Sequence, residues 1–104
     1  MASGRLFAAD LSAGAYNNAY QVPASKTTTC NISICNRNST SVMVRIALAA
    51  ATGTPANAEF IEYNAMIPGF GVLERSGIVI DAAKYITVYS DTANVSAVAY
   101  GFEE

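Results

Sequence analysis

Apolar and polar residues alternate along most of this chain, as they do in β-strands, whose successive side chains point to opposite faces of a sheet. The alternation is strongest in residues 27–50, TTTCNISICNRNSTSVMVRIALAA. One run places Ile32 and Ile34 on a single face, and the next run does the same with Val44 and Ile46. The polar letters NRNSTS between them favour a turn. We predict a β-hairpin with one apolar wall, which needs a second sheet about 10 Å away to be stable in water.

Shorter alternating runs predict the remaining strands, and turn residues separate them. We expect these strands at residues 16–22, 59–67, 72–80, 85–90 and 95–102. About seven to eight short strands with a turn every 8 to 12 residues or so indicate an all-β fold, an antiparallel β-sandwich of the jelly-roll or immunoglobulin-like type. We assign residues 15–104 to this single domain.

Three local features refine the expected strands. Gly77 interrupts the alternation of its strand and predicts a bulge. Pro68 and Gly69 predict a type II turn, with Gly69 at the position that needs a positive φ. In residues 59–67 the alternation places Tyr63 on the same side as Ile61 and opposite the intervening polar positions.

Residues 1–14 are rich in Ala, Ser and Gly, with Leu6, Phe7 and Leu11 as the larger apolar residues. This composition suits an N-terminal arm that docks on the body of the domain or on a neighbouring copy. We therefore expect Leu6, Phe7 and Leu11 to anchor a protein interface.

The chain carries few charges. Lys and Arg number 6 and Asp and Glu number 8, so 13% of the residues are charged, against roughly 25% in an average soluble protein. A surface with so few charges resists self-association poorly, and we expect other copies or a partner to cover part of it. The alternative is a stable monomer with a neutral surface. The net charge of -2 and the lack of a basic run argue against a nucleic-acid partner.

The chain also lacks the usual signals for a membrane or for secretion. It contains no run of about 20 apolar residues, so we expect no transmembrane helix and no membrane partner. The first residues, MASGRLFAADLSAGA, do not form a signal peptide, because Asp10 interrupts the apolar segment. We expect synthesis and folding in a cytoplasm.

The residue types argue against catalysis, a metal or a cofactor. The chain has no His, which removes the usual general base near neutral pH and the commonest metal ligand. Cys30 and Cys35 lie in one strand with their α-carbons roughly 16 Å apart, beyond the reach of a disulfide, so we expect free thiols. We predict neither an enzyme nor a catalytic, metal or cofactor site.

Tyrosines are the remaining candidates for a binding surface. Tyr85 and Tyr89 alternate with Ile86 and Val88, so they point away from the core if those residues point inward. Exposed tyrosines stack on sugars or anchor protein interfaces. They also cap sandwich edges, and the sequence leaves these roles open.

Residues 16–104 resemble small β-sandwich modules in virion proteins of tailed bacteriophages. The resemblance lies in the YQVPASKTTTCNISICNRNSTSVMVRIAL segment, the turn at PGFGVLERSG and the ending VSAVAYGFEE. It implies a structural virion protein, either a capsid decoration (cement) protein or a tail or head fibre module. It further implies a homo-oligomer, often a trimer, that binds the major capsid protein or another virion protein.

We therefore expect a decoration protein that oligomerises and stabilises the head shell, with Leu6, Phe7, Leu11, Tyr85 and Tyr89 at protein interfaces. The alternative is a fibre module that binds a host receptor or glycan. The expected location is the virion.

Overall fold

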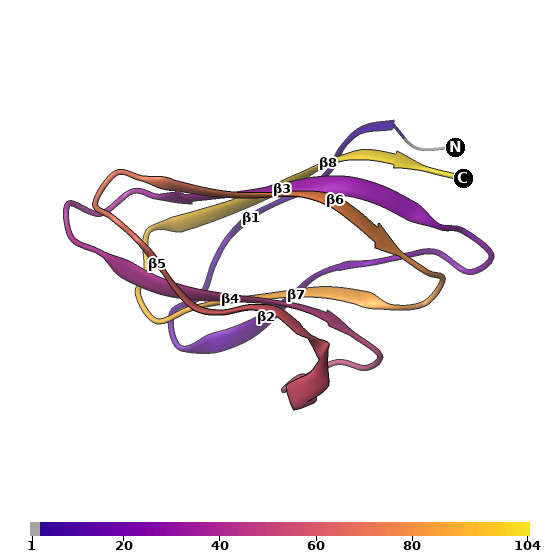
Figure 1. Ribbon diagram of the computed structural model, residues 1–104, viewed down its shortest axis with the longest axis horizontal. Coiled ribbons are helices and arrows are strands. Elements are labelled where there is room, and N and C mark those ends of the chain that lie inside the picture. The colour runs from indigo at the N-terminus through magenta and orange to yellow at the C-terminus, as the bar shows by residue number, and fades with distance from the viewer. Residues whose placement is uncertain (1–2) are drawn as a thin grey trace.

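The computed structural model describes residues 3–104, which form two four-stranded antiparallel sheets packed face to face (Figure 1). The strands are β1 (Ser3–Asp10), β2 (Ala15–Gln21), β3 (Thr28–Asn36), β4 (Val42–Ala49), β5 (Phe60–Ile67), β6 (Val72–Ile80), β7 (Tyr85–Ser90) and β8 (Val95–Glu103). A 3-10 helix, η1 (Asn57–Glu59), precedes β5. The predicted all-β sandwich is confirmed, and the seven strands expected from alternation lie within a residue or two of their predicted positions.

The strand order identifies the topology. One sheet has the order β1-β8-β3-β6 and the other β2-β7-β4-β5. The pairs β1 with β8, β2 with β7, β3 with β6 and β4 with β5 describe one long hairpin folded over on itself. This is the double Greek key of the jelly roll, one of the two sandwich types that the sequence predicted.

The predicted hairpin at residues 27–50 is wrong, because β3 and β4 belong to opposite sheets. Alternation could not distinguish the two arrangements, since it gives the same inward residues whether the strands pair or face each other. Asn36 fixes the observed arrangement. Its buried side-chain amide donates hydrogen bonds to the carbonyls of Thr40, Ile67 and Pro68, and so holds the β3–β4 loop against the β5–β6 loop.

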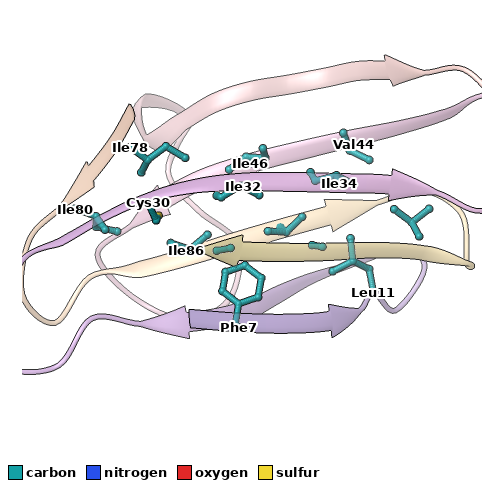
Figure 2. Close-up of a cluster of buried hydrophobic side chains, with 14 of the residues drawn as sticks. Phe7, Leu11, Cys30, Ile32, Ile34, Val44, Ile46, Ile78, Ile80 and Ile86 are labelled. Carbon is teal, nitrogen blue, oxygen red and sulfur yellow. The ribbon is translucent and has the colours of Figure 1, made fainter. Parts of the chain in front are cut away.

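The core lies between the two sheets and consists mainly of Ile and Val (Figure 2). Ile32 and Ile34 of β3 face Val44 and Ile46 of β4, and all four are fully buried. The predicted inward faces of these strands are therefore confirmed. β-Branched side chains suit this position because they pack well on a pleated surface.

The segment expected as an arm contributes a strand to the sandwich. β1 forms the edge of its sheet and pairs with β8 from Ser3 opposite Phe102 to Asp10 opposite Ser96. A bulge at Leu6 shifts the register, so the sequence shows no clear alternation there. Phe7 follows the bulge and points into the core (Figure 2).

Glycine positions confirm one turn prediction and correct another. Gly77 has a φ of 71° and lies in a bulge opposite Asn31, as predicted. In the turn that begins at Pro68 the residue with positive φ is Phe70, not Gly69. Gly69 is needed for a different reason: a Cβ there would lie 2.1 Å from the Ser39 carbonyl oxygen of the β3–β4 loop.

Among residues 3–104, no helix combines the length and the apolar character needed to span a bilayer.

Candidate functional site

The most elaborate surface feature is a group of aromatic side chains around one arginine on the outer face of the β2-β7-β4-β5 sheet. We name it the aromatic–arginine cluster, and it consists of Tyr16, Arg45, Phe60, Tyr63 and Tyr89. Strand pairing brings its centre together, because Tyr89 of β7 lies opposite Tyr16 of β2 on one side and opposite Arg45 of β4 on the other. The cluster thus spans all four strands of the sheet.

The Arg45 guanidinium lies over two aromatic rings, 4.3 Å from the ring centre of Tyr63 and 4.7 Å from that of Tyr89. It also donates hydrogen bonds to the Tyr16 hydroxyl and to Asn64 Oδ1, each at 2.7 Å. The bond to Tyr16 raises the pKa of Arg45 further above its ordinary value. Among the described residues Arg45 has no carboxylate partner, so the aromatic faces and hydrogen bonds hold the cation in place.

The rings of the cluster contact one another in a chain. Tyr16 lies 5.0 Å from Tyr89 and 6.1 Å from Phe60, measured between ring centres. Phe60 and Tyr63 also lie 5.0 Å apart, with their planes at 83°. Such edge-to-face pairs are favourable because the positive ring edge meets the negative ring face. The rings of the cluster therefore support one another.

Tyr63 belongs to this surface because of a bulge, which corrects its predicted position beside Ile61. Tyr63 and Asn64 of β5 together oppose the single residue Arg45 of β4. Asn64 accommodates the bulge with a φ of 53°, a conformation that Asn adopts more readily than most residues. The Tyr63 side chain is consequently 58% exposed, and no sequence signal comparable to Gly77 marked this bulge.

A hollow of about 470 Å³ adjoins the cluster where Asn57, Phe60 and Tyr63 meet. Its lining combines two aromatic rings and one amide, and none of the three side chains is charged. The Asn57 side chain belongs to η1 and makes no hydrogen bond among the described residues. A second hollow, of about 310 Å³, lies between β5 and β6 beside the ion pair of Arg75 with Glu62 (2.7 Å).

The opposite side of the sandwich presents a flat face centred on β3. We name it the β3 face, and it consists of Thr29, Asn31, Ser33, Cys35, Val72, Glu74, Val79, Ser96, Val98, Tyr100 and Phe102. Val79 and Phe102 flank Thr29 from the two sides and are 62% and 50% exposed. Glu74 is the one charged residue in this set, and it accepts a hydrogen bond from the Tyr100 hydroxyl at 2.9 Å. Two further charged residues, Arg5 and Asp10 of β1, lie next to the set, opposite Tyr100 and Ser96.

A carboxylate lies buried between the sheets near the C-terminal end of β8. Glu103 accepts hydrogen bonds from the Tyr20 hydroxyl and, at 2.9 Å, from Thr28 Oγ1. Burial, followed by the hydrogen bond to Glu103, raises the pKa of Tyr20 to about 12. Burial also raises the pKa of the Cys30 thiol, and the Glu103 charge adds to this effect. Cys30 is therefore a poor nucleophile, because its reactive thiolate is disfavoured.

The five predicted interface residues fall into three environments. Phe7 and Leu11 are buried in the core of their own chain, with little surface left for a partner. Leu6 packs partly against that core. Tyr85 and Tyr89 lie on the outer face of their strand, because Ile86 and Val88 point into the core as expected. Of the five, only Tyr89 belongs to the aromatic–arginine cluster.

Cys30 and Cys35 are free thiols, as predicted. Cys30 is buried, and Cys35 is partly exposed on the β3 face. Within residues 3–104, no three His, Cys, Asp or Glu side chains come together as a metal site. The side chains at these two surfaces support stacking and hydrogen bonding at the cluster, and apolar contact at the β3 face.

No family model, curated protein or solved structure matches this chain.

Proposed function

We propose that this protein is a structural subunit of a tailed-phage virion, a capsid decoration (cement) protein that forms homo-oligomers and stabilises the head shell. The jelly roll supports the proposal because viral capsid domains use this fold. The same fold also serves unrelated functions. The sequence resemblance to phage β-sandwich modules supports the virion location and the major capsid protein as partner. The trimeric state rests on that resemblance alone.

One observation carries the proposal: the β3 face exposes large apolar side chains and carries one charge, Glu74, with the charged Arg5 and Asp10 of β1 beside it at the edge of the sheet. Val79 and Phe102 lie two strand spacings apart, roughly 10 Å, on either side of Thr29. Two further exposed side chains extend the same face at separate points, Val72 opposite Cys35 and Tyr100 opposite Asn31. Apolar patches of this kind mark interaction sites.

The occupant that fits this face best is a second copy of the chain. A copy brings the same few charges, so little charge has to be stripped of water when two such faces meet. Apolar area is removed from water at the same time, which favours association. The two sheets thus take different roles, with the β3 face in assembly and the aromatic–arginine cluster left on the outside.

The copy number of this chain in purified virions tests the proposal. Quantitative mass spectrometry against the major capsid protein is expected to find hundreds of copies per particle, as a shell protein requires. A handful of copies would instead indicate a tail, collar or vertex fibre. Absence from the particles would contradict the virion role altogether.

A further inference from the structure

The aromatic corner beside η1 has the features of a small-molecule site. Phe60 and Tyr63 stand nearly perpendicular, at 83°, with ring centres 5.0 Å apart. The hollow that they share with Asn57 measures about 470 Å³ and is wide open to solvent, so it suits a ligand that binds by one face rather than one that is enclosed. Ligand sites are lined mainly by apolar and aromatic side chains with a few polar groups, and this lining has two rings and one amide.

Both rings of the corner are supported by contacts with the rest of the cluster. Phe60 contacts Tyr16, and the Arg45 guanidinium lies over the Tyr63 ring in a cation–π contact. Asn64 in turn holds Arg45 through a hydrogen bond of 2.7 Å. A ring held in this way loses little conformational freedom when a ligand stacks on it, so more of the stacking energy remains for binding.

From these features we propose that the Asn57–Phe60–Tyr63 corner binds a neutral saccharide. One face of a pyranose ring consists of C–H groups and stacks on an aromatic side chain, while its hydroxyl groups need donors and acceptors. Tyr63 is the stacking ring, since its side chain is 58% exposed. Asn57 supplies an amide that both donates and accepts, and that has no partner among the described residues.

The lining chemistry favours a neutral ligand over a charged one. The three lining side chains carry no charge, and the nearby Arg45 already directs its guanidinium toward Tyr16, Asn64 and the two rings. The inference goes beyond the proposed assembly role. The saccharide site lies on the β2-β7-β4-β5 sheet, and the β3 face lies on the other sheet. A second copy bound to the β3 face therefore leaves the corner open.

Saturation-transfer difference NMR on the whole chain tests this site. The probes are methyl β-galactoside, methyl β-N-acetylglucosaminide, methyl β-glucoside and methyl α-mannoside. At least one is expected to receive saturation, most strongly on the protons of one ring face. Tyr63→Ala is expected to weaken binding about fivefold, the equivalent of one stacking contact of about 1 kcal/mol. Tyr63→Phe keeps the ring and should retain most of the signal.

Two further variants make the result specific. Asn57→Ala removes the exposed amide without touching the core and should also weaken binding. Tyr100→Ala removes an exposed tyrosine from the β3 face and should leave binding unchanged. No saturation of any of the four probes would overturn the proposal, as would an equal loss in Tyr100→Ala. Loss in Tyr63→Phe as severe as in Tyr63→Ala would also overturn it, because stacking would then not be the interaction.

Discussion

Tyr20 of β2 donates its hydroxyl hydrogen to the buried carboxylate of Glu103 in β8, and this bond joins the two sheets near one end of the sandwich. Thr28 donates to the same oxygen atom of Glu103 at 2.9 Å. Phe7 stacks on the Tyr20 ring, with ring centres 6.2 Å apart. The first strand, the second strand and the last strand are thus tied together at one point.

The first prediction concerns the pH dependence of this bond. The pKa of Tyr20 is about 12 in the folded protein and close to its ordinary value of 10.0 in the unfolded chain. The folded state therefore keeps this proton to higher pH, so the stability that the bond contributes is fully present below pH 10 and is lost as pH rises toward 12. Tyr20→Phe should remove this part of the pH dependence. Urea unfolding at several alkaline pH values measures it, and an unchanged slope in the variant would contradict the assignment.

The second prediction separates a core role for Phe7 from the interface role that the sequence suggested. Phe7 is 9% exposed and contacts the core, so Phe7→Ala should lower the free energy of unfolding by about 3 kcal/mol. Leu6→Ala should cost less, because Leu6 only packs partly against the core. Denaturant unfolding at low protein concentration makes the comparison. Full stability of Phe7→Ala combined with lost self-association would show instead that Phe7 acts between copies.

The third prediction concerns Asn36, which bonds to three carbonyls and accepts a hydrogen bond from the Asn38 amide nitrogen. Asn36→Ala should lower the free energy of unfolding by about 3 kcal/mol, because it leaves buried backbone groups without partners. Asn57→Ala is the matched control, since its exposed amide bonds to nothing among the described residues, and it should change stability by less than about 0.5 kcal/mol. Equal effects of the two changes would contradict the role of Asn36.

Alternation predicted the positions of seven strands, but the bulge in β5 changed which way the Tyr63 side chain points. β3 and β8 pair with each other without a register shift and lie close to their predicted positions, and β6 also lies close to its predicted position despite its bulge at Gly77. β1 was missed because the bulge at Leu6 interrupts its period and four of its eight residues are Ser, Gly or Ala. The assignment of β3 and β4 to different sheets was also beyond the sequence, because it depends on contacts of Asn36 with residues about 30 positions away.

The candidate site was less predictable than the fold. Tyr89 was expected to face outward, and its side chain lies on the outer face of β7. Tyr63 and Phe60 gave no such signal, because two irregularities in the pairing of β4 with β5 decide which way the β5 side chains point. Arg45 was visible as an outward residue of its run, but its aromatic neighbours come from β2, β5 and β7 and are brought together only by the sheet.

The central claim is that the β3 face binds a second copy, and sedimentation velocity across micromolar to millimolar concentrations tests it most directly. The double variant Val79→Thr with Phe102→Thr keeps β-forming residues and removes apolar surface, whereas Met66→Thr changes an equally exposed residue on the other sheet. We expect the unmodified protein and Met66→Thr to sediment as oligomers and the double variant to sediment as a monomer. If the unmodified protein sediments as a monomer at every concentration, the β3 face does not bind a second copy.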